Sequence, residues 1–132
     1  MKERVQTAGA PAAIGPYSQA VRVGEWVFCS GQIGLDPTTG ALVSGGTAAE
    51  AERALANLAA VLATAGGSLD DVVRTTIYLV DLADFARVNE LYGTRFRPPF
   101  PARSTVGVAS LPRGARIEID AIATLKRRGE AE

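Results

Sequence analysis

The sequence predicts an α+β fold in which a mixed β-sheet carries two helices on one face. This expectation rests on the order of the elements, which is strands, a helix, a strand, a second helix and two last strands. A chain of 132 residues can bury one core without a disulfide or a metal. Because no change of composition suggests a linker, residues 1–132 are expected to form a single domain.

A hairpin and a turn open the predicted sheet. The segments 21–23 and 26–29 are rich in strand-forming residues, and the two-residue connection Gly24-Glu25 is typical of a hairpin. The segment Asp36-Pro37-Thr38-Thr39-Gly40 then predicts a turn, because proline fixes one φ angle and glycine permits a positive one.

The first helix is predicted to begin at Thr47, because Thr47 and Glu50 have the spacing of a capping box. Gly66-Gly67 is expected to end it, since glycine adopts a left-handed conformation at little cost. The apolar residues of its buried face repeat at helical spacing and are Ala51, Leu55, Leu58 and Leu62.

The segment 72–80 is β-branched and aromatic and predicts a strand. Its expected core face carries Val73, Thr75, Ile77 and Leu79, and its other face carries Val72, Arg74, Thr76, Tyr78 and Val80. A second helix is predicted to begin near Asp81 or Asp84 and to end before Pro98-Pro99, because proline clashes with the preceding helical turn.

The segments 101–105 and 117–123 are predicted to form the last hairpin, with Leu111–Gly114 as its turn. Residues 117, 119, 121 and 123 are apolar and share one face, while Glu118 and Asp120 lie about 7 Å apart on the other. In this hairpin Arg103, Thr105 and Gly107 are expected to share the face of Glu118, Asp120 and Ile122.

That face mixes aliphatic and charged groups, which favours a subunit interface with a polar site and therefore a homo-oligomer. A solvated outer face with scattered apolar residues is the alternative.

Composition excludes several classes of function. Lys plus Arg number 14 and Asp plus Glu number 14, so the chain is neutral and neither nucleic acid nor an anionic membrane is an expected partner. The absence of histidine excludes Ser-His-Asp and Cys-His catalysis and the usual zinc sites. Gly31-Gln32-Ile33-Gly34 is not a dinucleotide fingerprint, and Gly66-Gly67 follows a helix where a phosphate loop precedes one.

The cellular setting is expected to be the cytoplasm. The single Cys29 cannot form an internal disulfide, which fits a reducing compartment. A buried structural thiol is favoured over a reactive one at this position. No apolar run approaches the roughly 18 residues of a membrane span, and the N-terminus lacks a signal-peptide core. The charged end Lys126–Glu130 is expected to be loose.

Four residues are candidates for chemistry, and each has a plainer alternative. Tyr17 follows a Gly-Pro turn that can aim its phenol into a cleft, or it is a packed aromatic. Arg103 offers a planar fork for a carboxylate, or it is a surface charge. Glu118 can accept a proton from water, or it is a solvated strand carboxylate. Ser30, before Gly31, can offer a hydroxyl or lie beside an exposed backbone N–H, or it caps a turn.

Taken together, four segments of the chain closely resemble the reactive intermediate deaminase family, RidA, also called YjgF. They are Ala12-Ala13-Ile14-Gly15-Pro16-Tyr17-Ser18-Gln19-Ala20, Cys29-Ser30-Gly31-Gln32-Ile33, Pro101-Ala102-Arg103-Ser104 and Ile117-Glu118-Ile119-Asp120-Ala121-Ile122-Ala123. Asn57, the segment 79–85 and Val88-Asn89 also stand in family order, so the resemblance spans nearly the whole chain.

The resemblance implies a chorismate-mutase-like fold and a homotrimer with three sites in clefts between subunits. It also implies hydrolysis of 2-imino acids, or of enamine tautomers such as 2-aminoacrylate, to 2-oxo acids and ammonia, with no cofactor and no covalent nucleophile. An imine carbon is already electrophilic, so help from a general base of about 10²–10⁴-fold suffices.

The family pattern also implies a role for individual residues. Arg103 is expected to hold the substrate carboxylate and Glu118 to position the attacking water. The backbone of Ser104 and Thr105 and the Ser30-Gly31 region are expected to orient the substrate. Tyr17 is expected to close the cleft from a neighbouring subunit, and Asn89 is expected to contact substrate.

Two positions depart from the family pattern. Thr105 stands where many members have cysteine, and Glu50 stands where glutamine is common. Activity with an altered substrate preference is therefore expected.

Two other functions remain open. One is a non-catalytic module that senses 2-oxo or short carboxylic acids in the same clefts. The other is a ribonuclease or translation inhibitor, which neutrality and the lack of histidine disfavour.

Overall fold

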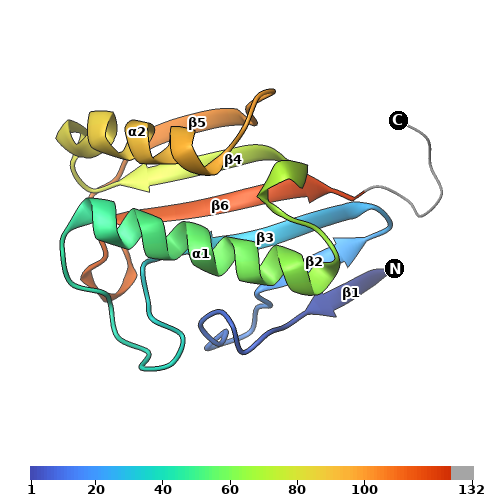
Figure 1. Cartoon of the computed structure of the whole chain (residues 1–132). Helices are drawn as coiled ribbons and strands as arrows, with labels where there is room; N and C mark the ends of the chain where they lie inside the picture. Colours follow the sequence, from blue (N-terminus) through green and yellow to red (C-terminus); the bar gives the residue numbers. More distant parts are fainter. Residues whose placement is uncertain (126–132) are drawn as a thin grey trace.

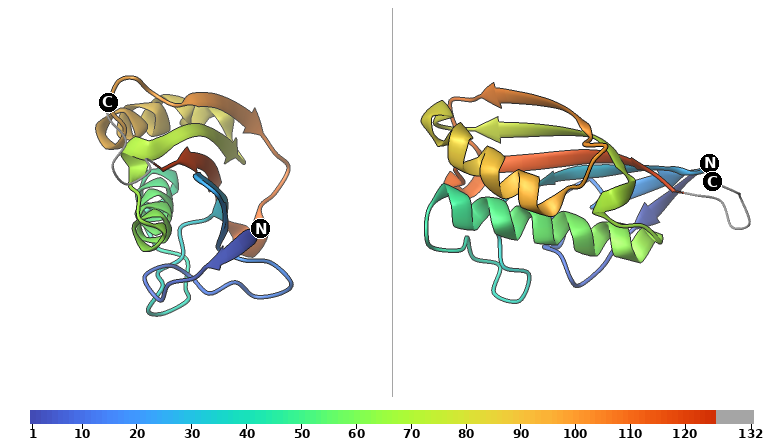
Figure 2. Two further views of the ribbon diagram at one scale, coloured as in Figure 1. Left: turned by 90° about the vertical axis from the view of Figure 1, so that its right-hand side faces the viewer. Right: turned by 45° about the horizontal axis from the view of Figure 1, so that its top comes forward.

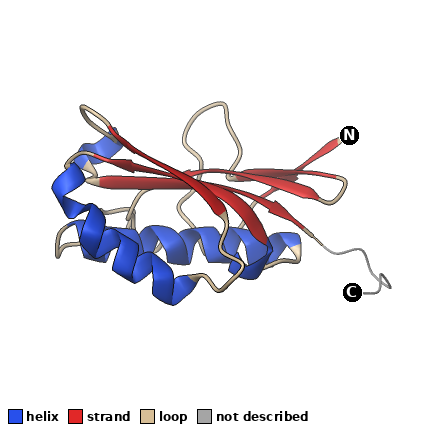
Figure 3. Ribbon diagram, turned by 90° about the horizontal axis from the view of Figure 1, so that it is seen from above, coloured by secondary structure: helices blue, strands red, loops and turns tan. Residues whose placement is uncertain are grey.

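The computed structural model describes residues 1–125, which form an α+β sandwich of two layers. One layer is a six-stranded sheet, and both α-helices cover the same face of it (Figures 1 and 3). The predicted fold class is therefore confirmed. The charged end Lys126–Glu130 lies outside the described residues. Within residues 1–125, no helix is both long and apolar enough to cross a membrane.

The strands follow the order β1-β2-β3-β6-β4-β5 across the sheet. They are β1 (Lys2–Val5), β2 (Ala20–Val23), β3 (Trp26–Gln32), β4 (Val72–Leu79), β5 (Ala102–Gly107) and β6 (Ile117–Thr124), and the helices are α1 (Thr47–Ala65) and α2 (Phe85–Arg95). Only the pair β4–β5 is parallel among the described strands. The first hairpin is confirmed, because Val23 pairs with Trp26. The edge strand β1 was not predicted.

The predicted hairpin of 101–105 with 117–123 is wrong. β6 lies between β3 and β4, whereas β5 pairs with β4 and runs parallel to it at the edge of the sheet. The cause is α2, which joins β4 to β5. A helical crossover returns the chain to the end where the previous strand began, so the new strand runs parallel to it. Figure 2 shows α2 on one face of the sheet, running back from the tip of β4 toward the start of β5.

The two faces of β4 are as predicted except at its start. Thr75, Ile77 and Leu79 are fully buried on the helix side. Val72 is 5% exposed and Val73 is 41% exposed, which reverses their predicted faces. The pairing of β4 with β6 shifts between Val72 and Arg74, and such a bulge changes which side chains point inward.

The first helix has the predicted limits but not the predicted cap. Its N-cap is Gly46, which has no side chain to offer. The Thr47 hydroxyl instead donates to Oδ2 of Asp84 at 2.7 Å, and Oε1 of Glu50 accepts from the backbone N of Arg116 at 2.8 Å. Both side chains are buried, so contacts with distant segments replace the local cap. At the other end, the left-handed Gly66 ends the helix as predicted.

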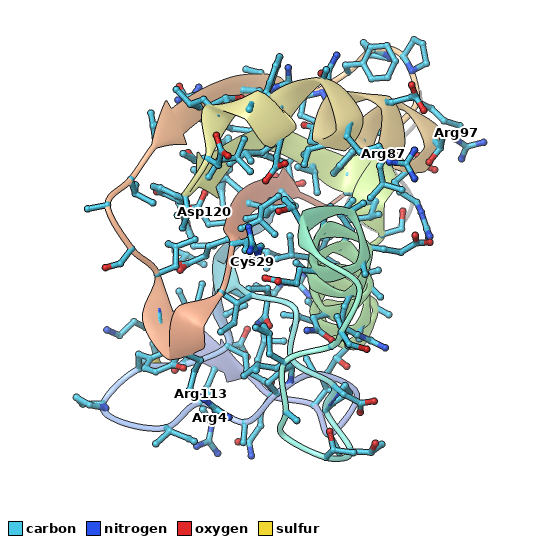
Figure 4. The ribbon with its side chains drawn as sticks, turned by 90° about the vertical axis from the view of Figure 1, so that its left-hand side faces the viewer. Arg4, Cys29, Arg87, Arg97, Arg113 and Asp120 are labelled. Carbon is cyan, nitrogen blue, oxygen red and sulfur yellow. The ribbon has the colours of Figure 1, made fainter. Side chains whose placement is uncertain are left out.

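The core lies between α1 and the centre of the sheet. Its fully buried side chains include Leu55, Leu58, Leu62, Ile77, Leu79, Ile117 and Ile119. Cys29 is 7% exposed and lies between the sheet and α1 (Figure 4). Burial raises the pKa of its thiol to about 12, and the negative charge of Asp120 contributes. The thiol is therefore protonated at neutral pH, and the expectation of a buried structural thiol is confirmed.

Asn57 ties α1 to the loop that follows β3. Its side chain is fully buried. Nδ2 donates to the carbonyl oxygens of Ile33 at 3.3 Å and Leu35 at 3.0 Å, and Oδ1 accepts from Nε of Arg53 at 3.0 Å. One amide thus fixes the path of the chain directly after Ser30 and Gly31.

Replacing Asn57 with alanine is expected to lower the free energy of unfolding by about 1–3 kcal/mol, because two carbonyl oxygens lose their donor. Urea unfolding followed by circular dichroism measures this change. The matched control is Asn89→Ala on the exposed side of α2, which is expected to leave the urea midpoint unchanged. An equal midpoint for Asn57→Ala and the unaltered protein would contradict the assigned role.

Candidate functional site

The two strongest candidates, Arg103 and Glu118, lie on opposite faces of the sheet. Arg103 on β5 pairs with Thr75 of β4, whose side chain is buried on the helix side. Glu118 on β6 pairs with Tyr78 of β4. Because neighbours in register share a face and successive residues alternate, Glu118 points away from the helices. The prediction that Arg103, Thr105 and Gly107 share the face of Glu118 is therefore wrong.

This face without helices is called the open face below. Its residues are Trp26, Phe28, Arg74, Thr76, Tyr78, Ser104, Val106, Glu118, Asp120 and Ile122. It combines aromatic and aliphatic groups with charges, as the sequence predicted for β4 and β6. Trp26 is 48% exposed and Phe28 is 42% exposed.

Arg103 lies against the aromatic rings of α2. Its guanidinium carbon is 5.3 Å from the centroid of the Phe85 ring and 4.8 Å from that of the Tyr92 ring. Within residues 1–125, Arg103 forms no ion pair with a carboxylate. Its fork of N–H donors is thus open to an anionic ligand.

A cavity of about 400 Å³ opens beside Arg103. Its walls are Asn89, Tyr92, Gly93, Phe100, Pro101 and Arg103. The structure thus brings together two predicted site residues, Asn89 and Arg103. One cation beside aromatic and aliphatic groups suits a small carboxylate, because the planar fork fixes the orientation of the carboxylate.

A second cavity, of about 640 Å³, contains four more of the predicted residues. Tyr17, Ser30, Gly31 and Glu118 all line it, together with apolar side chains that include Ile14, Ile33 and Leu35. Tyr17 is 56% exposed. Its ring is therefore not the packed aromatic of the plainer alternative.

Glu118 lies directly against the backbone of Gly31. The pairing of β3 with β6 shifts between Cys29 and Gln32, and a methyl group at Gly31 would overlap Oε2 of Glu118. A larger residue at position 31 would thus displace the Glu118 carboxyl group from its present position. Burial raises the pKa of Glu118, and the charge of Asp120 raises it further. A carboxylate with a raised pKa is a stronger base than a solvated one, which suits a role in proton transfer.

Asp120 is held firmly beside this carboxyl group. Its Oδ2 accepts from the Tyr78 hydroxyl at 3.0 Å, and its Oδ1 accepts from the backbone N of Thr76 at 3.2 Å. Asp120, labelled in Figure 4, is therefore a fixed negative charge whose field acts on Glu118.

Ser30 does not cap a turn, which was the plainer of its predicted roles, but bonds to a distant loop. Its hydroxyl donates to the carbonyl oxygen of Ser18 at 2.6 Å, and its backbone N donates to that of Gln19 at 2.9 Å. The side chain thus holds the loop that carries Tyr17. The adjacent backbone still lines the cavity through Gly31.

Gln19 is a positioning residue that the sequence analysis missed. Its side chain is 3% exposed. Nε2 donates to the carbonyl oxygens of Thr7, Ala10 and Pro11, and Oε1 accepts from the backbone N of Thr7 at 2.7 Å. A buried amide with every polar atom bonded fixes the loop on both sides of Tyr17. The only signal in the sequence was its place two residues after Tyr17.

Ser104 and Thr105 lie on the edge strand β5 and line neither of the two cavities. Oγ of Ser104 accepts from Nη2 of Arg74 at 2.8 Å on the open face. Thr105 pairs with Ile77 and so points to the helix side. An edge strand leaves one side of its backbone available, so these residues can contact a ligand or another subunit by main-chain atoms.

Arg113 is a cation that lines the Glu118 cavity, and its role was not predicted. It lies in the turn before β6 with a positive φ of 62° (Figure 4). Nη2 donates to the carbonyl oxygen of Gly40 at 2.9 Å. The predicted turns at 36–40 and 111–114 are thus joined at the rim of this cavity.

Comparison with known proteins agrees with both the fold and the motifs. The family model described as Endoribonuclease L-PSP matches residues 7–125. The 2-iminobutanoate/2-iminopropanoate deaminase of Mus musculus is 52% identical over 123 residues, which are 93% of this chain and 91% of that protein. The Homo sapiens protein of that name is 54% identical over 119 residues, covering 90% of this chain and 87% of that protein.

The solved structures give the same result. The crystal structure of RidA from the Antarctic bacterium Psychrobacter sp. matches with a TM-score of 0.90 at 47% identity. The match covers 93% of this chain and 99% of that chain. The chain therefore belongs to the RidA (YjgF) family, whose family model carries the description Endoribonuclease L-PSP.

Proposed function

We propose that this protein hydrolyses 2-iminobutanoate and 2-iminopropanoate, together with their enamine tautomers, to 2-oxo acids and ammonia. The observation that carries this proposal is the combination of an open guanidinium at Arg103 with a half-buried, proton-accepting carboxyl group at Glu118. Relatives at about half identity over most of the chain bear the corresponding deaminase name. Free Cys29 fits a reducing compartment, so we place the reaction in the cytoplasm.

The active site that we propose is shared between subunits of a homotrimer. Arg103 and Glu118 lie on opposite faces and line different cavities of one chain, so a single small substrate cannot reach both. A second subunit can bring its Tyr17 and Glu118 to the Arg103 cavity of the first. The exposed aromatic and aliphatic groups of the open face offer a surface for this association.

The proposed reaction needs only acid–base chemistry. Arg103 holds the carboxylate of the protonated imine. Glu118 takes a proton from water as the water oxygen bonds to C2 and the C=N π pair moves to nitrogen. Glu118 then returns this proton to the amine. The C–N bond breaks as the hydroxyl oxygen forms C=O, and the nitrogen leaves as ammonia. The hydroxyl proton passes to Glu118, which releases it to solvent and is again ionised.

The first test uses imines generated in situ by an amino-acid oxidase, with semicarbazide as the competing trap. The unaltered protein is expected to accelerate imine loss. Arg103→Ala is expected to lower kcat/KM by about 10- to 100-fold, which corresponds to losing a charged, two-point hydrogen bond. Arg103→Lys is expected to be nearly as damaging, because lysine lacks the planar fork.

Two outcomes would count against the proposal. Full activity of Arg103→Lys would show that a two-point contact is unimportant. A folded protein that binds 2-oxobutanoate but accelerates neither imine would instead be a non-catalytic carboxylate sensor.

Glu118→Gln is expected to lower kcat by about 10²–10⁴-fold while leaving the Kd for 2-oxobutanoate nearly unchanged, because glutamine cannot accept the proton. Since the base must be ionised, kcat/KM is expected to fall as the pH drops through the pKa of Glu118. Burial raises this pKa, so the inflection is expected above about 4.3, the ordinary value for glutamate.

Asp120→Asn is the matched variant for this pH profile. It removes the negative neighbour that raises the pKa of Glu118. The inflection is therefore expected to move to lower pH. An inflection that stays in place in Asp120→Asn would show that the titrating group is not Glu118.

A further inference from the structure

We infer that Phe85, Tyr92 and Thr75 form a cradle that fixes the Arg103 guanidinium in the position where it receives the substrate carboxylate. The inference deepens the proposed function and rests on it for the identity of the carboxylate. Phe85, Tyr92 and Thr75 are positioning residues, since they act through Arg103.

The aromatic part of the cradle comes from one side of α2. Phe85 and Tyr92 are seven residues apart, about two helical turns, so both rings face the same direction. The guanidinium carbon of Arg103 lies 5.3 Å from the first ring centroid and 4.8 Å from the second. Two rings therefore confine one cation that comes from the neighbouring strand β5.

The second ring is itself held in place. The Tyr92 side chain is 4% exposed, and its hydroxyl is 2.8 Å from Oγ1 of Thr75, which is fully buried. Thr75 lies on β4 directly beside Arg103. The ring of Phe96 also packs against the Tyr92 ring, with 4.4 Å between the centroids. Arg103, Tyr92 and Thr75 thus each contact the other two, which links β5, α2 and β4 at this point.

The cradle suits a ligand-binding arginine better than an ion pair does. A carboxylate partner would occupy the N–H donors that the substrate needs. An aromatic face attracts the positive charge through its quadrupole and leaves these donors open. The long side chain of Arg103 is thereby restrained before the substrate arrives, which lowers the entropy lost on binding.

The first test removes one ring. Phe85→Leu is expected to raise the KM for 2-iminobutanoate and the Kd for 2-oxobutanoate about fivefold, within the range of a partly desolvated cation–π contact. The kcat value is expected to change less than about twofold, because ground state and transition state lose the same contact. Phe85→Tyr restores a ring and is expected to restore both constants.

The control for folding is Leu91→Ala, which truncates a partly buried core contact of the same helix. It is expected to lower the melting temperature and leave KM unchanged. If Phe85→Leu behaves like Leu91→Ala, with unchanged KM and Kd, the ring only stabilises the fold and the inference is overturned.

The second test separates the effect of the Tyr92–Thr75 contact on KM from its effect on melting temperature. Tyr92→Phe leaves the Thr75 hydroxyl without its partner and is expected to lower the melting temperature. Adding Thr75→Val removes the unpaired hydroxyl, so the double variant is expected to recover the melting temperature that the single variant loses. Its KM is expected to stay about two- to threefold raised, because the ring has lost its anchor. Recovery of KM together with stability would show that this contact has no positioning role.

A readout without ligand distinguishes failure of the cradle from failure of the proposed function. The Nε–Hε NMR signal of Arg103, identified by its loss in Arg103→Lys, is expected to shift in Phe85→Leu as the ring current disappears. An unmoved signal would overturn the cradle even if imines are hydrolysed. A moved signal in a protein that hydrolyses no imine would keep the cradle and reject the deaminase proposal.

Discussion

The central position of β6 in the sheet is the constraint on which the rest of the structure depends. Ile117, Ile119 and the small residues after them are buried against α1, so the intervening carboxylates must face away from the helices. The same placement leaves β5 no partner except β4 and sends it to the edge. The register at that edge turns Arg103 toward the helices. One strand thus decides where both charged groups of the site lie.

Separating the two charges has an electrostatic consequence. A guanidinium in contact with Glu118 within one chain would lower the pKa of that carboxyl group and would itself be occupied. Instead, burial and Asp120 keep the pKa of Glu118 raised, and the rings of α2 hold Arg103 without using its donors. Arg103 and Glu118 thus each have the state that the reaction needs before they meet. A carboxylate substrate between two subunits would complete it.

Much of the fold can be predicted from the sequence, because many of its elements depend on local patterns. The first hairpin, the limits of α1 and the end of α2 follow from turn residues, periodicity and proline. Long-range pairing is what sequence reasoning missed. Segments 101–105 and 117–123 are neighbours in sequence, but helical crossover favours β4 as the partner of β5. Similarly, Thr47 and Glu50 have capping spacing, yet burial gives each a distant partner.

The most direct test of the central claim, a site shared between subunits, is complementation between two variants that each lack one of the two groups. Arg103→Ala and Glu118→Gln chains are mixed, unfolded and refolded together, and trimer mass is checked by light scattering. If each cleft takes Arg103 from one subunit and Glu118 from the next, about one quarter of the clefts regain both groups by random assembly, and about a quarter of full activity returns. If both groups acted from the same chain, the mixed trimers would show only the residual activity of the two variants.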